Sequence, residues 1–185
     1  MPIFEPIHSL RLTIRKLQDT DIADLFEING DPEVTSFLPY NTWQSEADGA
    51  AWVQRMHAMA TTGTAEQFVL ELDETRKVIG TLLLFKYDQA NSRAELGYVL
   101  GRQYWQQGLM HEALAAFCGY ALHSMGLRRL EAEVNPSNHA SNALLLRLGF
   151  TKEGTLRSRW IEKSAVCDAH IYGLLREEWL VKQGA

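Results

Sequence analysis

The sequence is poor in cysteine and has no recognisable metal-binding pattern. Its two cysteines, Cys118 and Cys167, form no C-x-x-C pair, and its six histidines show neither H-x-x-x-H nor H-x-H spacing. A chain without paired cysteines does not rest on a disulfide framework and fits a reducing compartment. Because zinc sites use closely spaced His and Cys ligands, we expect no metal cofactor.

Long apolar runs and an excess of basic charge are missing as well. The longest apolar run, TLLLF at 81–85, is far shorter than the ~20 residues that cross a bilayer. The first ten residues lack the basic and apolar regions of a signal peptide. The net charge of −5, from 18 basic and 23 acidic residues, argues against binding along a phosphate backbone. We therefore expect a cytoplasmic protein that binds neither a membrane nor a nucleic acid.

The sequence contains no internal repeat, no low-complexity tract and no linker rich in Pro, Gly or Ser. Its hydrophobic content of 46% and charged content of 22% are typical of a soluble globular protein. A chain of this length can bury a sizeable core. We expect one domain over residues 1–185.

Hydrophobic periodicity predicts a series of strands and helices. The expected strands are 10–17, 66–73, 77–88, 93–101, 128–134 and two more within 151–163 and 168–176; the expected helices are 19–30, 45–63, 109–125 and 139–149. The step from 93 to 134 is strand, helix, strand, which should be parallel and right-handed. The result is a mixed α+β sheet. A Rossmann fold is excluded because there is no G-x-G-x-x-G and no repeated βα alternation.

The segment YWQQGLMHEA, at 104–113, has the features of an anion site at a helix start. The first N–H groups of a helix have no intrahelical partner, and the helix dipole is positive there. Gly108 has no Cβ and would let a phosphate approach the backbone closely. Gln106, Gln107 and His111 add side-chain donors. On these residues alone, Gly108 can equally be a simple turn residue and His111 an exposed helix residue.

Five segments in order resemble the GNAT superfamily of N-acetyltransferases, and within it the RimJ/RimL ribosomal-protein N-acetyltransferases. They are AELGYVL (94–100), YWQQGLMHEAL (104–114), LRRLEAEVNPSNHASNALLLRLGF (127–150), EGTLR (153–157) and DAHIYGLLREEW (168–179). With a weaker match at LRLTIR, the resemblance covers nearly the whole chain. It implies a mostly antiparallel sheet of about seven strands flanked by helices, with one splayed strand pair that receives acetyl-CoA. The group contains monomers and homodimers, so both states stay open.

The resemblance assigns the acetyl-CoA contacts residue by residue. The family's pyrophosphate motif falls on 105–110, with its middle glycine at Gly108 and with Met110 where a small residue is typical. Met110 must therefore point away from the cofactor. The pantetheine arm would pair with the backbone of one strand, and Asn138 would face the pantetheine or act as a helix N-cap. The implied backbone contacts are Tyr98, Val99 and Leu100 to pantetheine, and Gln106, Gln107, Gly108, Leu109, Met110 and His111 to the pyrophosphate.

Glu95 is the candidate general base for direct attack of an amine on the thioester. It lies in an otherwise apolar strand segment, where partly apolar surroundings can raise a carboxyl pKa to a value suited to proton transfer. The alternatives are a solvent-facing strand residue or an ion pair, for example with Arg93 or Arg129. Whether Glu95 acts directly or through water is open.

The resemblance implies Ser141 as the group that assists departure of the thiolate, and Tyr172 as its rival. A phenol is the more natural proton donor, whereas a serine hydroxyl more readily hydrogen-bonds the sulfur. Each residue has a structural alternative: Ser141 as an ordinary residue in the first helical turn, and Tyr172 as part of the core. Asp168 would orient a substrate amine or anchor a hairpin.

The acceptor implied by the resemblance is a primary amine, either the N-terminal α-amine of a protein or a small amine such as an amino acid, a polyamine or an antibiotic. A non-catalytic acyl-CoA-binding domain is the alternative from another class. The segments 19–62 and 157–168, which would shape the acceptor site, carry no signature. Trp43 and Trp160 are open candidates for that site, whereas Trp52 and Cys118 have the spacing of core residues.

Overall fold

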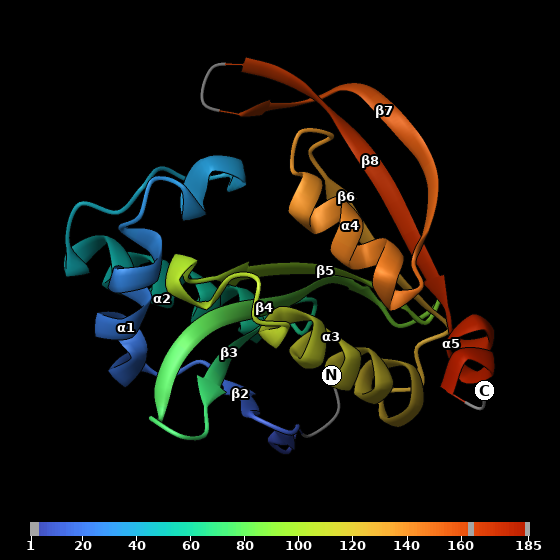
Figure 1. Cartoon of the computed structure of the whole chain (residues 1–185), viewed down its shortest axis with the longest axis horizontal. Coiled ribbons are helices and arrows are strands. Elements are labelled where there is room, and N and C mark those ends of the chain that lie inside the picture. The colour runs from blue at the N-terminus through green and yellow to red at the C-terminus, as the bar shows by residue number, and fades with distance from the viewer. Residues whose placement is uncertain (1–3, 163–164, 184–185) are drawn as a thin grey trace.

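The computed structural model describes residues 4–162 and 165–183. Within these residues the chain forms thirteen named helices and strands, joined by short 3-10 and π turns (Figure 1). In chain order they are β1 (Ile7–His8), β2 (Leu12–Lys16), α1 (Ile22–Asn29), α2 (Glu46–Thr61), β3 (Glu66–Leu72), β4 (Lys77–Asp88), β5 (Arg93–Leu100), α3 (Leu109–Gly119), β6 (Arg129–Val134), α4 (His139–Leu148), β7 (Thr151–Glu162), β8 (Ala165–Leu175) and α5 (Arg176–Gln183).

The described strands form one sheet of eight strands in the order β1-β2-β3-β4-β5-β6-β8-β7. Every neighbouring pair is antiparallel except β5 and β6, which are parallel and are connected through α3. The mixed, mostly antiparallel sheet and the parallel step over 93–134 confirm the fold class predicted from the sequence. The β7–β8 hairpin projects from one end of the sheet (Figure 1).

Three elements differ from the sequence-based expectation. β1 and α5 were not expected, because a two-residue strand and a short charged helix carry almost no periodic signal. The regular part of the helix expected over 109–125 ends at Gly119, and the chain continues as a π turn over Tyr120–Ser124. Lys163, the last residue of one expected strand, lies outside the described residues.

Helices cover both faces of the sheet, because its central strands are apolar on both sides. One core cluster packs α3, α4 and α5 on one face, through residues such as Phe117, Leu145 and Trp179. The other packs α1 and α2 on the opposite face. Adjacent residues of β3 alternate between the two clusters, as the period of a strand requires.

Of the three tryptophans considered in the sequence analysis, Trp43 and Trp52 are core residues and Trp160 is not. Trp43 and Trp52 are each 5% exposed, and their ring centroids lie 5.7 Å apart within the α1–α2 cluster. Trp43, left open by the sequence, therefore packs in the core rather than lining a cleft. Trp160 is 42% exposed on β7. Cys118 is fully buried on α3, which raises its thiol pKa to about 12 and makes it a packing residue.

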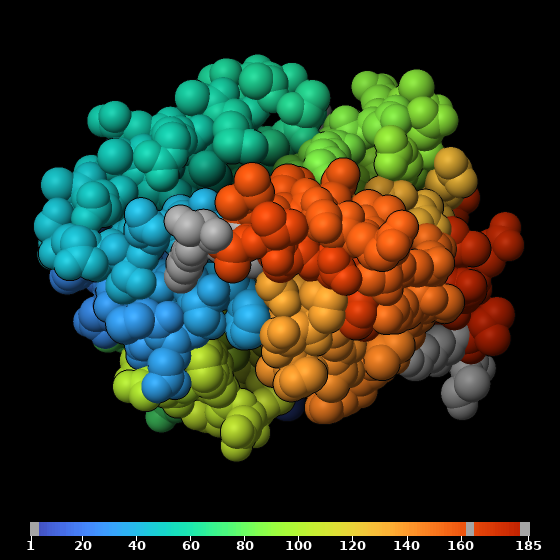
Figure 2. Space-filling view, turned by 90° about the horizontal axis from the view of Figure 1, so that it is seen from above, coloured from blue at the N-terminus to red at the C-terminus, as the bar shows by residue number. Residues whose placement is uncertain are grey.

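The β7–β8 hairpin lies above the sheet, toward the segment between α1 and α2 (Figure 1). Seen from above, β7–β8 lies across the middle of the molecule, beside the blue to cyan segment that includes the turn Val34–Phe37 (Figure 2). In the described part of the chain, none of the helices combines the length and the apolar character needed to cross a membrane.

Candidate active site

The central feature of the site is the point at which β5 and β6 part. Their parallel pairing joins Arg93 to Arg129, Ala94 to Leu130 and Glu95 to Glu131, and stops there. β5 nevertheless continues to Leu100 along β4, and β6 continues along β8. Strand backbone groups that have no neighbouring strand need another partner. The opening therefore begins directly after Glu95.

The open side of β5 is formed by alternate peptide groups. The Val99 carbonyl oxygen points toward β4, because it would lie only 2.5 Å from a Cβ atom on Gly80. Peptide groups alternate along a strand, so those of Tyr98 and Leu100 face the opening. The Leu100 carbonyl already accepts a hydrogen bond from the Trp105 indole at 2.8 Å. The Val99 carbonyl thus faces β4, whereas the peptide groups of Tyr98 and Leu100 lie on the side where the pantetheine contact is expected.

At the other end of the opening, the α3 N-terminus is exposed and preceded by a left-handed glycine. Gly108 has φ +76°, and a Cβ added there would meet only the Arg11 guanidinium, at 3.7 Å. The N–H groups of Leu109, Met110 and His111 lie in the first turn, outside the i→i−4 ladder. The Met110 side chain is 7% exposed and packs in the core with Leu109. It therefore points inward and leaves the loop free, as the anion-site interpretation requires.

The two glutamines of this loop are exposed, and a nearby arginine was not anticipated. Gln106 has φ +60°, and the Gln107 side-chain amide donates to the Gln103 carbonyl at 2.8 Å. Arg11, from the segment before β2, donates to the Gln107 carbonyl at 3.2 Å and pairs with Glu112 at 2.8 Å. It brings a positive charge to the loop. No local sequence signal connects it to a residue 96 positions later.

Glu95 is buried at the parting point and forms an ion pair. The side chains of Ala94 and Leu96 enter the α3 core cluster, so Glu95 between them faces the opposite side of the sheet. It is 5% exposed, and its carboxylate lies 2.6 Å from the Lys86 ammonium. Burial raises the pKa of Glu95, and Lys86 opposes that rise. An ion pair was foreseen, but the expected partners Arg93 and Arg129 are wrong because both bind Glu131 instead.

A second carboxylate, that of Glu133 on β6, lies next to Glu95 and contacts side chains from β4 and β7. It accepts hydrogen bonds from Arg159 and from the Trp160 indole on β7, each at 3.1 Å, and lies 3.4 Å from the Lys86 ammonium of β4. Burial opposes ionisation of Glu133, but Arg159 and Lys86 hold its pKa below the ordinary value. Trp160 therefore lies beside the acidic face of the site.

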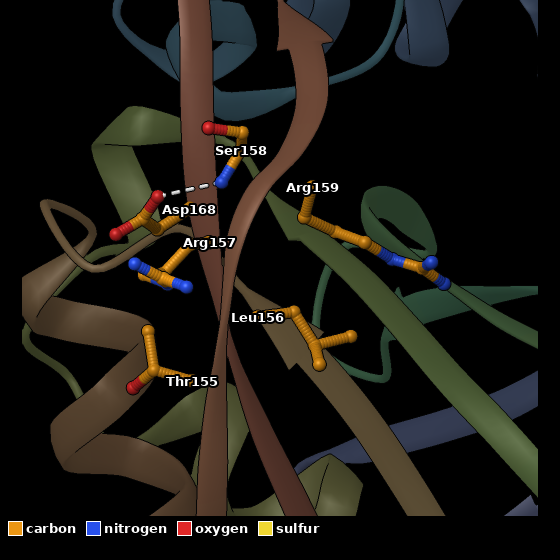
Figure 3. Close-up of a pocket in the computed structure, with 6 residues that line it drawn as sticks. All are labelled: Thr155, Leu156, Arg157, Ser158, Arg159 and Asp168. Carbon is orange, nitrogen blue, oxygen red and sulfur yellow. Dashed lines mark hydrogen bonds between the residues drawn. The ribbon is translucent and has the colours of Figure 1, made fainter.

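A bulge in β7 interrupts its pairing with β8 between Leu156 and Trp160. Figure 3 shows Leu156 and Arg159 extending from one side of β7, and Thr155 and Arg157 from the other. Ser158 has φ +50°, and its N–H donates to the Asp168 carboxylate of β8 at 2.8 Å. Of the two roles left open for Asp168, this contact supports anchoring of the hairpin. These residues line an open pocket with a volume of about 830 Å³.

Across the opening, Tyr98 of β5 meets Ser141 of α4. Their hydroxyl oxygens lie 2.7 Å apart. Asn138 caps α4, since its side-chain oxygen accepts the Ser141 N–H at 3.1 Å. Burial raises the pKa of Tyr98, so its phenol stays protonated. The predicted Ser141 hydroxyl is therefore in direct contact with a phenol to which the sequence analysis assigned only backbone contacts.

Tyr172, the alternative to Ser141 as the group that assists thiolate departure, has its hydroxyl bonded to Asn142. It is 2% exposed, and its hydroxyl donates to the Asn142 side-chain oxygen at 2.7 Å. The Asn142 amide donates to the carbonyls of Asn135 and Asn138, so its oxygen also accepts from His170 Nδ1 at 2.9 Å. Asn142 thus holds α4, the preceding turn and β8 together. The structure places Tyr172 in this framework, and no sequence signal singled out Asn142.

The described residues contain no group of three or more His, Cys, Asp or Glu side chains placed to hold a metal ion. The ionisable groups at the opening are instead carboxylates paired with Lys or Arg.

Comparison of the sequence with known protein families identifies the family of this chain. A family model described as an acetyltransferase (GNAT) domain matches residues 11–151. The chain therefore belongs to the GNAT acetyltransferases and is an N-acetyltransferase.

Individual relatives are similar over most of the chain. The chain is 35% identical over 175 residues to the uncharacterized N-acetyltransferase p20 of Bacillus licheniformis, covering 95% of this chain and 98% of that protein. It is 30% identical over 129 residues to the ribosomal-protein-serine acetyltransferase of Escherichia coli, covering 70% and 71%. A solved structure of the ribosomal L7/L12 alpha-N-protein acetyltransferase RimL in complex with coenzyme A has the same fold, with TM-score 0.83, 21% identity and coverage of 92% and 98%.

We predict that Asn142→Ala destabilises the protein by about 2 kcal/mol or more, because the Tyr172 hydroxyl and the Asn135 and Asn138 carbonyls lose their partner. Urea unfolding followed by circular dichroism measures the change. Asn91→Ala, which removes an exposed amide bonded to Asp88 at 2.8 Å, serves as the control and should change stability by under about 0.5 kcal/mol. Equal effects of the two variants would contradict the framework role.

Proposed function

We propose that this N-acetyltransferase transfers acetyl from acetyl-CoA to a primary amine, with the N-terminal α-amine of a protein as the first candidate acceptor. The observation that carries the proposal is Glu95, a buried carboxylate at the point where β5 and β6 part. The absence of a disulfide between Cys118 and Cys167 suits the reducing cytoplasm as the place of this reaction.

The opening has the chemistry that coenzyme A needs. Coenzyme A supplies the acetyl group as a thioester, and it carries a pyrophosphate and an amide-containing arm. The free N–H groups at the α3 start, together with Arg11, suit the pyrophosphate. The peptide groups of Tyr98 and Leu100 on the open side of β5 suit the amide arm. The related RimL structure, which has the same fold, contains coenzyme A.

Glu95 and Ser141 would handle the protons of the reaction from opposite sides of the sheet. The amine nitrogen forms a bond to the carbonyl carbon, and the carbon–sulfur bond breaks. The proton lost by the amine goes to the Glu95 carboxylate, directly or through water, and the departing thiolate receives a proton from Ser141. Because Tyr98 lies 2.7 Å from Ser141 Oγ, its phenol can replace that proton.

The acceptor assignment rests on the relatives and on amine basicity. One relative is a ribosomal-protein-serine acetyltransferase, which acts on a protein. An α-amine, with a pKa of ~7.7–8.0, is partly neutral near neutral pH, whereas a lysine amine near ~10.4 is almost fully charged. A single carboxylate base such as Glu95 is therefore sufficient for an α-amine. A small amine acceptor and a non-catalytic acyl-CoA-binding domain remain the alternatives that experiment must separate.

The test is a thiol-release assay with acetyl-CoA and a panel of acceptors: peptides beginning with Ser or Ala, free amino acids, polyamines and aminoglycosides. We expect turnover with a peptide α-amine, and a loss of about 10²-fold or more in kcat for Glu95→Gln with acetyl-CoA binding retained. Glu71→Gln, which alters an equally buried carboxylate on β3 (4% exposed), should retain turnover. Selective turnover of polyamines or amino acids would assign the acceptor to the small amines instead of protein α-amines. Binding of acetyl-CoA without turnover of any acceptor would favour a non-catalytic acyl-CoA-binding domain.

The same assay has a predicted pH dependence. Glu95 must be ionised to take the proton, and burial raises its pKa above the ordinary value of 4.5, with Lys86 lowering it and Glu133 and Glu131 raising it. On acidification, kcat/KM should therefore fall at a higher pH than an ordinary glutamate would give.

Gly108→Trp should weaken coenzyme A binding by about tenfold or more, because a bulky side chain would cover the exposed N–H groups of the α3 start. Calorimetric titration of coenzyme A measures it, and tenfold corresponds to about 1.4 kcal/mol. Gly126→Trp is the matched control: Gly126 also has a left-handed φ, of +70°, and nothing lies within 4 Å of its added Cβ. Equal weakening in both variants would show a general effect of strain and contradict the pyrophosphate site.

Ser141→Ala and Tyr98→Phe should each lower kcat, by about 10-fold or more, while Tyr172→Phe should leave kcat near the wild-type value. The reason is that Tyr98 and Ser141 form the proton-donating pair, whereas Tyr172 gives its proton to Asn142. Steady-state kinetics with the accepted amine distinguish these outcomes. A large kcat loss confined to Tyr172→Phe would instead assign the acid to Tyr172.

A further inference from the structure

The Glu95 carboxylate has a cation beside it in the free protein. Within residues 4–162 and 165–183, its ion-pair partner is the Lys86 ammonium, 2.6 Å from Oε2. The other carboxylates nearby are held by arginines: Glu131 by Arg93 and Arg129, and Glu133 by Arg159, with Lys86 farther away at 3.4 Å. Glu95 differs from them because its close partner carries the same primary ammonium group that a protonated amine acceptor carries.

Lys86 reaches this position from an exposed irregularity of β4. The pairing of β4 with β5 is interrupted between Phe85 and Asp88, and Lys86 within the interruption has φ +51°. Its side chain is 49% exposed, whereas those of Glu95 and Glu133 are 7% and 14% exposed. A long flexible chain thus enters from solvent and places its ammonium between two largely buried carboxylates. It can withdraw toward solvent without disturbing buried packing.

We propose that the Lys86 ammonium occupies the position between Glu95 and Glu133 in which the ammonium group of an acceptor binds. We call this position the ammonium seat. An acceptor binds there by displacing Lys86. This inference rests on the proposed function, because it takes Glu95 to be the group that faces the acceptor. Lys86 is then a specificity-determining residue: it competes with every acceptor for the same two carboxylates. An acceptor must therefore carry its own positive charge to take the seat.

The arrangement also explains how Glu95 is kept ready in the free enzyme. The charged groups that face it are Lys86 from β4, Glu131 and Glu133 from β6, and Arg159 from β7. Burial and the two glutamates oppose its ionisation, and Lys86 favours it. While Lys86 holds the seat, its charge favours the ionised form of Glu95. When the acceptor's ammonium replaces Lys86, the carboxylate meets the very proton that it has to accept.

The test compares Lys86→Met with the wild type in two measurements. The first is calorimetric titration of n-butylammonium chloride into protein saturated with coenzyme A, which requires no turnover. Lys86→Met should bind this probe about fivefold more tightly or better, the size expected for loss of a half-exposed ion pair. The second is the KM for the amine that the wild type acetylates, which should fall by a similar factor while kcat changes less.

Three controls define the effect. Lys16→Met removes a lysine of nearly equal exposure, 48%, that pairs with Glu66, and it should change neither measurement. Lys86→Arg keeps a competing cation and should bind the probe like the wild type. Lys86→Met combined with Glu95→Gln should lose the gain in binding. If Lys86→Met does not fold, Lys86→Gln makes the same test with a polar neutral side chain.

Unchanged or weaker n-butylammonium binding by Lys86→Met, or a raised KM, would overturn the inference. Tighter probe binding without turnover of any acceptor in the wild type would support the ammonium seat and contradict the proposed function. Turnover by the wild type with no change on removing Lys86 would support the proposed function and contradict the seat. The two failures are therefore distinguishable.

Discussion

The constraint on which the rest of the site depends is the early end of the β5–β6 pairing. Three residue pairs join the two strands. Beyond Glu95, β5 pairs only with β4, and β6 pairs only with β8. Parallel strands joined through a helix tolerate this because each has an antiparallel partner on its far side. The break leaves part of β5 without a neighbouring strand on one side, sets α3 and α4 on one face of the gap, and puts a buried carboxylate on the other.

Electrostatics on the face opposite α3 and α4 follow from strand periodicity. Residues 131 and 133 of β6 alternate with apolar core residues, and Glu95 alternates with Ala94 and Leu96 on β5, so three carboxylates gather on one surface. Burying like charges together is costly unless cations accompany them. Lys86, Arg93, Arg129 and Arg159 meet that need from four different strands. Through Arg159 and Trp160, this charge pattern connects the β7–β8 hairpin to the candidate site.

Features encoded in short segments could be predicted from the sequence, and contacts between distant segments could not. The place of Gly108 before α3, the Asn138 cap and the strand position of Glu95 depend on a few neighbouring residues. Arg11 at the α3 start and Asn142 beneath Tyr172 depend on the packing of segments that are far apart in the sequence. Lys86 lies only nine residues from Glu95, but its position depends on the irregularity in the β4–β5 pairing. The side to which the Val99 carbonyl points follows from the register between strands, which the sequence alone does not give.

The two sides of the sheet depend on different parts of the chain. The candidate cosubstrate contacts come from β5, the α3 start and the α4 cap, whereas Glu133 meets Arg159 and Trp160 of the β7–β8 hairpin. Changes in the hairpin can therefore accumulate without altering the groups that would hold coenzyme A. Under the function proposed above, such a division would allow the acceptor preference to change through the hairpin while the coenzyme A contacts stay the same.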